Sequence, residues 1–175
     1  MLKGNPNVLS TLWLDDRYIL KSSLAYGVLR DNRDIFASKQ AYHSFCGYAH
    51  SQFKKMTAFN FEGYMGAKRK SLVEKYHFDV KNAAHLIRLL RMGIEFLTEG
   101  ELYVERKLDA GELLSIKRGE WSLDKVKAEA DKLFKLCEGA YIRSPLPNKP
   151  DFEKANEIVE DIILTTINRR VLNEE

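Results

Sequence analysis

Apolar residues recur at helical spacing along most of the chain. The clearest stretch runs from Val80 to Thr98, where an apolar side chain returns every three or four positions and forms one stripe. Asp79 before this stretch and Gly100 after it are residue types that commonly begin and end a helix. We therefore predict one long helix here, with its apolar stripe packed into the core.

The same spacing, with capping residues at the ends, predicts further helices on both sides of this one. Asn5 followed by a proline opens the first, and Asp109 and Ser122 each begin a later one. Gly63 and Gly66 mark a turn before a short basic helix. The predicted helices cover residues 5–13, 18–30, 38–56, 67–76, 109–117, 122–143 and 151–171.

Two details complete the predicted fold. Residues 102–105 carry the one convincing strand signal, and it is short. In the last helix, Ile158, Ile162 and residues 164–167 are expected to face the core. The pattern predicts a single all-α domain over residues 1–175, with about seven helices and at most one short β ribbon.

Composition supports one folded domain and excludes several classes of protein. The 175 residues are 45% hydrophobic and 11% aromatic, which is enough for a core and too much for a disordered chain. No apolar run approaches the roughly 20 residues of a membrane span, and the first residues lack the apolar stretch of a signal peptide. Cys46 and Cys137 form no CxxC pair, so we expect neither a disulfide framework nor a zinc site, and a cytoplasmic location.

Basic residues gather in one part of the chain. The segment 68–91 holds seven Lys or Arg residues and two acidic ones, whereas the net charge of the whole chain is +3. At helical spacing, Lys81, His85 and Arg88 fall within a narrow arc, with Arg91 at its edge. Such a cluster suits phosphate groups, because Arg offers a bidentate fork, Lys a point charge and His a switchable donor. A solvated helix surface explains the same spacing.

Polar residues share one face of the helix predicted over residues 38–56. His43 and His50 are seven positions apart, too far along a helix to hold one metal ion. Gly47 between them is unfavourable inside a helix, which indicates close approach by a ligand or tight packing against another helix. Three further polar residues suit hydrogen bonds to a nucleotide or to one another within a polar seam: Tyr48, Ser51 and Gln52.

Known nucleotide-binding and hydrolase motifs are missing, but a set of shorter motifs points to one family. The chain has no GxxxxGK[ST], GxGxxG, HExxH or GxSxG pattern. It does carry, in order, KGNPNV at 3–8, NRDIF at 32–36, GYAHSQ at 47–52, KRK at 68–70, DVKNAAHLIRLLR at 79–91, RGEWS at 118–122 and SPLP at 144–147. This ordered set resembles the RlaP/YcgL-like nucleotidyltransferases of the DNA polymerase β superfamily, found in bacteria and phages and linked in part to RNA repair.

The resemblance implies nucleotidyl transfer from an NTP to an acceptor such as RNA, but it covers only the helical C-terminal half of such proteins. In the family, a Gly-Ser loop and metal-binding carboxylates lie in an αβ catalytic domain upstream of the KGNP segment. We expect this domain to be absent here, because Met1 and Leu2 directly precede Lys3. No catalytic residue and no metal ligand is then predicted in the chain, and Mg²⁺ and NTP are implied only together with a catalytic partner half.

By the same resemblance, a cleft facing the triphosphate or the acceptor is expected. Its nucleotide- or phosphate-binding candidates are Lys68, Arg69, Lys81, His85, Arg88, Arg91, Tyr48, Ser51 and Gln52. Three functions fit these residues. The chain is the substrate-binding half of a split or truncated nucleotidyltransferase, or a stand-alone nucleotide- or RNA-binding module. Alternatively it is a non-catalytic interaction domain, which would form a homodimer through uncovered apolar surface.

Overall fold

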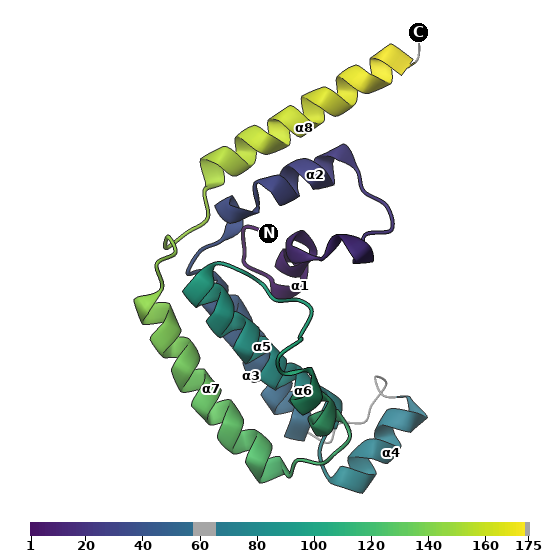
Figure 1. The fold of residues 1–175 in the computed structure, drawn as a ribbon, viewed down its shortest axis with the longest axis vertical. Helices are drawn as coiled ribbons and strands as arrows, with labels where there is room; N and C mark the ends of the chain where they lie inside the picture. Colours follow the sequence, from purple (N-terminus) through teal and green to yellow (C-terminus); the bar gives the residue numbers. More distant parts are fainter. Residues whose placement is uncertain (58–65, 174–175) are drawn as a thin grey trace.

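The predicted all-α fold is confirmed. The computed structural model describes residues 1–57 and 66–173, and within these ranges it contains helices and no β-strand. Eight α-helices and three short 3₁₀ helices follow one another in chain order (Figure 1). They are α1 (Pro6–Leu9), η1 (Ser10–Trp13), η2 (Asp16–Tyr18), α2 (Leu24–Asp31), η3 (Arg33–Phe36), α3 (Ala41–Thr57), α4 (Ala67–Tyr76), α5 (Val80–Glu99), α6 (Ala110–Lys117), α7 (Leu123–Arg143) and α8 (Phe152–Asn173).

Helix α5 is the centre of the molecule, with α3, α6 and α7 packed around it (Figure 1). Its apolar stripe is buried as predicted, and Phe96 stacks on Phe45 of α3 with ring centroids 6.2 Å apart. Gly93 allows this approach, because a Cβ at this position would lie 3.1 Å from the Cβ of Phe45. The close contact of α3 and α5 fixes the relative positions of the polar faces that both helices carry.

The predicted caps of the long helices are present. The side chain of Asp79 accepts hydrogen bonds from the backbone N–H of Lys81 (3.0 Å) and Asn82 (3.1 Å) at the start of α5. Gly100 ends α5 in a left-handed conformation with a φ of 76°. The Ser122 hydroxyl accepts from the N–H of Lys125 at the start of α7. Asp79 and Ser122 thus satisfy backbone donors at helix starts, and the Gly100 N–H donates to the carbonyl of Phe96 at the helix end.

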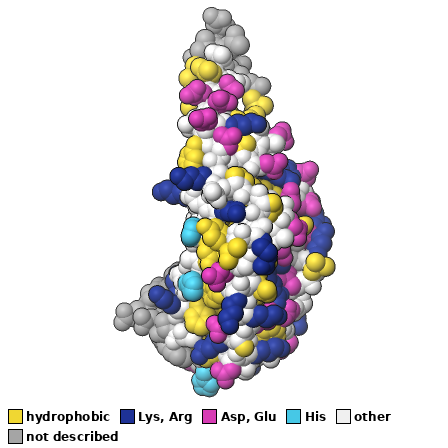
Figure 2. Space-filling model, turned by 90° about the vertical axis from the view of Figure 1, so that its left-hand side faces the viewer, with side chains coloured by type: hydrophobic (Ala, Val, Ile, Leu, Met, Phe, Trp, Pro, Cys, Tyr) yellow, Lys and Arg dark blue, Asp and Glu magenta, His cyan; other side chains and the backbone are white. Residues whose placement is uncertain are grey.

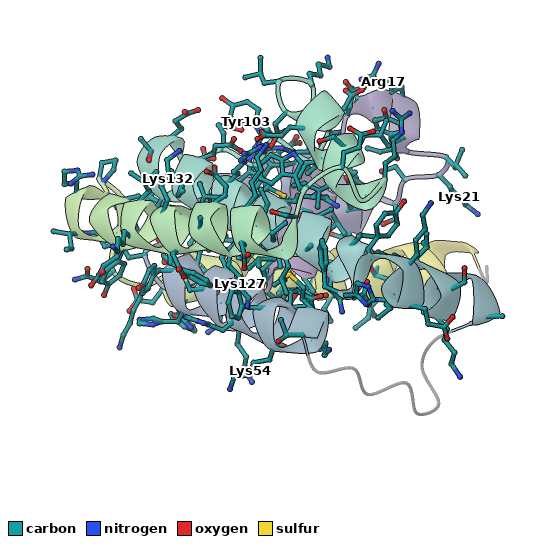
Figure 3. All side chains as sticks on the ribbon, turned by 90° about the horizontal axis from the view of Figure 1, so that it is seen from below. Arg17, Lys21, Lys54, Tyr103, Lys127 and Lys132 are labelled. Atoms are coloured by element: carbon teal, nitrogen blue, oxygen red, sulfur yellow. The ribbon has the colours of Figure 1, made fainter. Side chains whose placement is uncertain are left out.

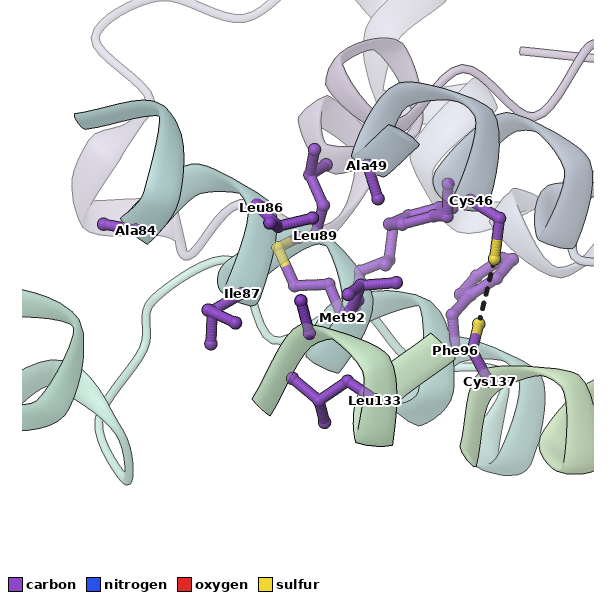
Figure 4. Packing of buried hydrophobic residues seen from close by; sticks show 14 of the residues in the cluster. Cys46, Ala49, Ala84, Leu86, Ile87, Leu89, Met92, Phe96, Leu133 and Cys137 are labelled. Atoms are coloured by element: carbon purple, nitrogen blue, oxygen red, sulfur yellow. Dashed lines mark hydrogen bonds between the residues drawn. The ribbon is translucent and has the colours of Figure 1, made fainter. Parts of the chain in front are cut away.

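The two cysteines lie next to each other in the core, although they are far apart in the sequence. Their Sγ atoms are 3.4 Å apart where α3 meets α7, and both thiols are free and buried (Figure 4). The contact with Cys46 and burial both raise the pKa of the Cys137 thiol, so this thiol stays protonated. As an apolar contact between two helices, the pair joins α3 to α7 within the core.

Several predicted element boundaries were wrong. The helix expected over 18–30 is divided, because residues 19–23 between η2 and α2 are not helical. Helix α3 begins at Ala41, since the carbonyl of Ser38 accepts from the Ala41 N–H in a turn that precedes it. Gly63 of the predicted turn lies outside the described residues. The strand predicted at 102–105 is an irregular segment, because no described strand pairs with it and Leu102 anchors it in the core.

The last helix was predicted correctly in type, and its burial was predicted correctly at Ile158 but not at residues 164–167. Helix α8 packs against α2 and η3, away from the bundle of α3, α5 and α7 (Figure 1). Ala155 and Ile158 are therefore buried, whereas Leu164 and Ile167 remain 59% and 52% exposed and do not face the core. Hydrophobic and acidic side chains gather below the grey tip, on the upper part of the face shown in Figure 2. None of the helices in the described ranges is long and apolar enough to cross a membrane.

Candidate anion-binding site

A cavity of about 340 Å³ opens where α3, α4, α5 and α6 meet. Its walls are basic and polar, and no Asp or Glu is among the residues that line it. The lining residues are Tyr48, Gln52, Lys55, Arg69, Lys81, Asn82, Ala84, His85, Arg88, Leu113 and Lys117. We call this cavity the basic pocket. Its charge suits an anion with several negative oxygens, such as a di- or triphosphate.

Helix α5 supplies the central cations of the basic pocket. Lys81, His85 and Arg88 follow one another at intervals of four and three residues, which places them on one side of the helix, as the sequence predicts. Lys81 near the first turn is exposed, while His85 and Arg88 deeper along the helix are half-buried. The capped start of α5 and its buried stripe hold these three side chains in a fixed order from the rim to the interior.

Arg88 has hydrogen-bonding capacity that the protein does not use. Its Nε atom is buried and has no hydrogen-bond partner among the described residues. Burial, followed by the nearby charge of Arg106, lowers the pKa of the Arg88 guanidinium from its usual value. An unpartnered buried donor on a charged group is costly. A bound oxyanion would relieve this cost, because it offers an acceptor and a compensating charge at the same point.

His85 is held beside Tyr48 at the centre of the basic pocket. The two rings meet edge to face, with centroids 5.2 Å apart. Burial is the main cause that lowers the pKa of His85, and the charges of Arg88, Lys117 and Lys81 lower it further. The imidazole is therefore neutral at pH 7. A bound anion would reverse the electrostatic part of this shift, so that ligand binding and protonation of His85 favour each other.

Arg69 connects α4 to the start of α5. Its Nε donates to Asp79 (2.8 Å) and its Nη2 donates to Asn82 (2.8 Å). Asp79 is only 2% exposed, so this ion pair is shielded from solvent. Arg69 therefore lines the basic pocket with much of its charge already matched. Lys68 precedes it in α4, but its side chain lies outside the described residues.

Arg91 and Ser51 are not brought into the basic pocket. Arg91 lies beside the arc, three residues after Arg88, but its guanidinium is paired with Asp109 (3.1 Å), Glu112 (2.7 Å) and Glu129 (3.4 Å). Ser51 lies on α3 outside the pocket lining. The sequence candidates that the structure does bring together are Tyr48, Gln52, Arg69, Lys81, His85 and Arg88.

Two further lysines complete the basic pocket and were missed in the sequence. Lys55 follows Tyr48 by seven residues, so its place on the same face of α3 was visible in the helical spacing. Lys117 is the last residue of α6, and no sequence pattern indicates that α6 folds back over α5. Lys117 reaches the pocket only through tertiary packing.

A larger groove of about 980 Å³ lies elsewhere on the molecule and differs in charge. Its cations are matched by carboxylates: Arg33 bonds Glu101, and Arg106 bonds Glu95. Tyr103 of this groove projects from the side opposite to Lys54 of α3 (Figure 3). We call it the paired groove. Because its charges are largely satisfied, it is the less suitable of the two for binding a phosphate group.

Comparison with known protein families decides the relationship of the chain. Residues 1–159 match the family RlaP, described as RNA repair pathway DNA polymerase beta family. The chain belongs to this family. The resemblance identified from the ordered motifs is thereby confirmed. Comparison with curated proteins and with solved structures gave no match.

Proposed function

We propose that the RlaP chain binds the phosphate groups of a nucleotide in the basic pocket and acts in nucleotidyl transfer during RNA repair. The observation that carries the proposal is the cavity wall: Lys81, Arg88 and Lys117 converge there, and no carboxylate lines it. Family membership supports the reaction class. We further propose that the carboxylates that hold Mg²⁺ come from an αβ catalytic half outside these helices.

Each side chain of the basic pocket has a chemical role in this proposal. Arg88 lines the pocket and offers its guanidinium to a phosphate group, and Lys81 at the rim adds a flexible ammonium group. His85 takes up a proton when the anion binds and becomes a charged donor. Cations fixed around a pyrophosphate leaving group stabilise the charge that develops on it during transfer. The pocket thus contributes to binding and to charge stabilisation, while the reacting metals lie elsewhere.

A second candidate function is supported by the same cavity. The basic pocket already contains Lys81, Arg88 and Lys117, so we infer that these cations can hold a phosphate ligand without the catalytic half. A stand-alone binding module for a nucleotide or an RNA end would show this binding without any transfer. Binding measurements test the pocket, and transfer measurements separate the two functions.

The binding test uses calorimetry with ATP and inorganic tripolyphosphate as ligands. We expect Lys81→Ala/Arg88→Ala to weaken both by at least about ten-fold, because each removes a charge-assisted contact worth about 1.5–3 kcal/mol. The matched control is Lys132→Ala/Lys135→Ala, which removes two positive charges from the exposed surface of α7. Equal affinity of the pocket variant and the control variant would overturn the proposed site.

The transfer test adds the αβ catalytic half. The chain is mixed with the product of the neighbouring reading frame, Mg²⁺, a labelled NTP and a short RNA. Transfer of label that requires both polypeptides and falls with Lys81→Ala/Arg88→Ala supports the split enzyme. Binding without any transfer to RNA, protein or small acceptors favours the binding module.

A further inference from the structure

Helix α3 presents a second polar face that the basic pocket does not use. Between Ala41 and Thr57 the helix contains no Asp or Glu, so nothing on it repels an anion. Tyr48, Gln52 and Lys55 face the pocket, whereas another set of residues lies on the outer face. We call this set the α3 ridge; it consists of His43, Gly47, His50 and Lys54, all exposed.

Gly47 lies at the middle of the α3 ridge without a packing reason. A Cβ at this position would meet no heavy atom of the described residues within 4 Å. The contrast is Gly93, where a Cβ would press on Phe45 at 3.1 Å. Tight packing, one of the two explanations that the sequence leaves open for Gly47, is therefore excluded within the described part of the chain. A glycine here flattens the ridge and exposes the helix backbone to whatever crosses it.

One edge of the α3 ridge carries a pair of stacked rings. His50 stacks on Phe134 of α7, with ring centroids 4.2 Å apart and planes inclined by 14°. His50 is exposed and Phe134 is half-buried, so the pair forms part of the surface. On the face shown in Figure 2, histidine side chains lie beside hydrophobic ones along one edge. Flat rings at a surface are suited to stacking with a nucleobase.

The charge differs between the two ends of the α3 ridge. Toward the N-terminus of α3, burial is the main cause that raises the pKa of Tyr42, and Glu138 of α7 raises it further. A negative charge therefore lies near that end. Toward the C-terminus, Lys54 on the ridge is followed by Lys55 at the rim of the basic pocket. The favourable route for a polyanion leads from the His50–Phe134 pair over the part of the ridge between Gly47 and Lys54 to Lys55.

We propose that a single-stranded polynucleotide crosses α3 at Gly47, with one base stacked on the His50–Phe134 pair and its terminal phosphate in the basic pocket. The ridge selects single strands, because a base must leave its neighbours to stack on a protein ring. The proposal rests on the proposed function, since the pocket must accept phosphate for the strand end to be held there.

The test compares two probes, a 5′-phosphorylated RNA ten-mer and inorganic tripolyphosphate. Gly47→Gln places a neutral side chain on the route and improves helix propensity, so the variant folds. We expect it and His50→Ala to weaken binding of the ten-mer by about five-fold or more and to leave tripolyphosphate binding unchanged. Gly27→Gln on α2 is the matched control, because a Cβ there also meets nothing within 4 Å among the described residues.

The outcomes separate the two proposals. If Gly47→Gln and His50→Ala bind the ten-mer as tightly as the unmodified chain, the strand route is wrong and the pocket is unaffected. Failure of tripolyphosphate to bind the unmodified chain overturns the proposed function itself. A DNA ten-mer of the same sequence measures the contribution of the ribose hydroxyls, and equal binding of RNA and DNA still supports the route. Binding of a duplex as tightly as the single strand would overturn it.

Discussion

The two halves of α5 carry similar residues in different electrostatic settings. In the first half, Lys81 and Arg88 line the basic pocket, and no ion pair joins either of them to a carboxylate within the described ranges. The charge of Asp109 acts on Arg88, but burial and Arg106 outweigh it and lower the pKa of this guanidinium. In the second half, Arg91 is paired with three carboxylates, and Glu95 bonds Arg106. The helix is continuous, so its local conformation does not distinguish the halves. The distinction comes from the acidic residues that other segments place beside each half.

The paired half shows what a cation does when its partners are built into the fold. Burial opposes ionisation of Asp109, but hydrogen bonds from Arg106 and Arg91 outweigh it and lower the pKa of this carboxyl. Arg106 also bonds Glu95 and thereby fastens the irregular segment before α6 to α5. These charges hold elements together. The unmatched cations of the basic pocket contribute nothing comparable to stability, which leaves them available to a ligand.

We expect the largest effect on stability from removing the salt bridges in the second half of α5, where the cations are paired with carboxylates. Arg106→Met leaves Glu95 and Asp109 without their main partner in a half-buried site. We expect the free energy of unfolding to fall by about 3–5 kcal/mol, because uncompensated charges remain behind. Urea unfolding measures this loss, and tripolyphosphate affinity of the folded variant should change less than it does for Arg88→Met, because Arg106 does not line the basic pocket. A loss below about 1 kcal/mol would show that solvent screens the network.

We expect the next largest effect on stability from changes at the contact between α3 and α5. Gly93→Ala forces a Cβ against Phe45 and should lower the free energy of unfolding by about 1–3 kcal/mol. The matched variant Gly47→Ala meets open space within the described residues and should raise it by about 0.5–1 kcal/mol. Thermal unfolding of both variants provides the measurement. Equal effects of the two changes would contradict the described packing.

Replacing Arg88 separates stability from binding in the unmatched half. Arg88→Met keeps the stem of the side chain and removes a half-buried charge whose Nε is unpartnered. The free energy of unfolding should stay constant or rise by about 1 kcal/mol, while tripolyphosphate affinity falls about ten-fold. This pattern is the reverse of that expected for Arg106→Met. Loss of stability without loss of affinity would show that Arg88 is a structural cation.

The smallest expected effect concerns pH. Because folding lowers the pKa of His85 below its usual value near 6.5, the unfolded chain binds the proton more readily. The contribution of His85 to stability is therefore present above pH 6.5 and is lost as the pH falls through the folded-state pKa. As the pH falls over the same range, tripolyphosphate affinity should rise. His85→Gln should flatten both pH profiles, and unaltered profiles would exclude His85 as their source.

The sequence predicted local features well because their causes lie within a few residues. The Asp79 cap, the Gly100 stop and the arc of Lys81, His85 and Arg88 all depend on helical geometry alone. Arg91 lies close to that arc, and spacing cannot show that Asp109, Glu112 and Glu129 converge on it from α6, its cap and α7. Whether a cation has a carboxylate partner therefore depends on the tertiary structure.

The prediction of which α8 residues are buried was partly wrong for a related reason. Apolar residues at 164 and 167 fit the pattern of a core-facing helix, but the pattern does not say whether another element lies opposite them. The same gap concealed Lys117, which reaches the basic pocket because α6 folds back over α5. Spacing along one helix identifies a face, and only the arrangement of the other helices identifies its neighbour.

The position of α8 has a consequence for how the molecule fluctuates. Its main contacts are with α2 and η3, whereas α3, α5 and α7 share one continuous core. Such a helix detaches by a local opening that leaves the rest folded. Amide protons of α8 should then exchange with solvent through this opening, and those of α5 only through global unfolding. Hydrogen exchange would reveal two levels of protection within a single domain, with the boundary after Arg143 at the end of α7.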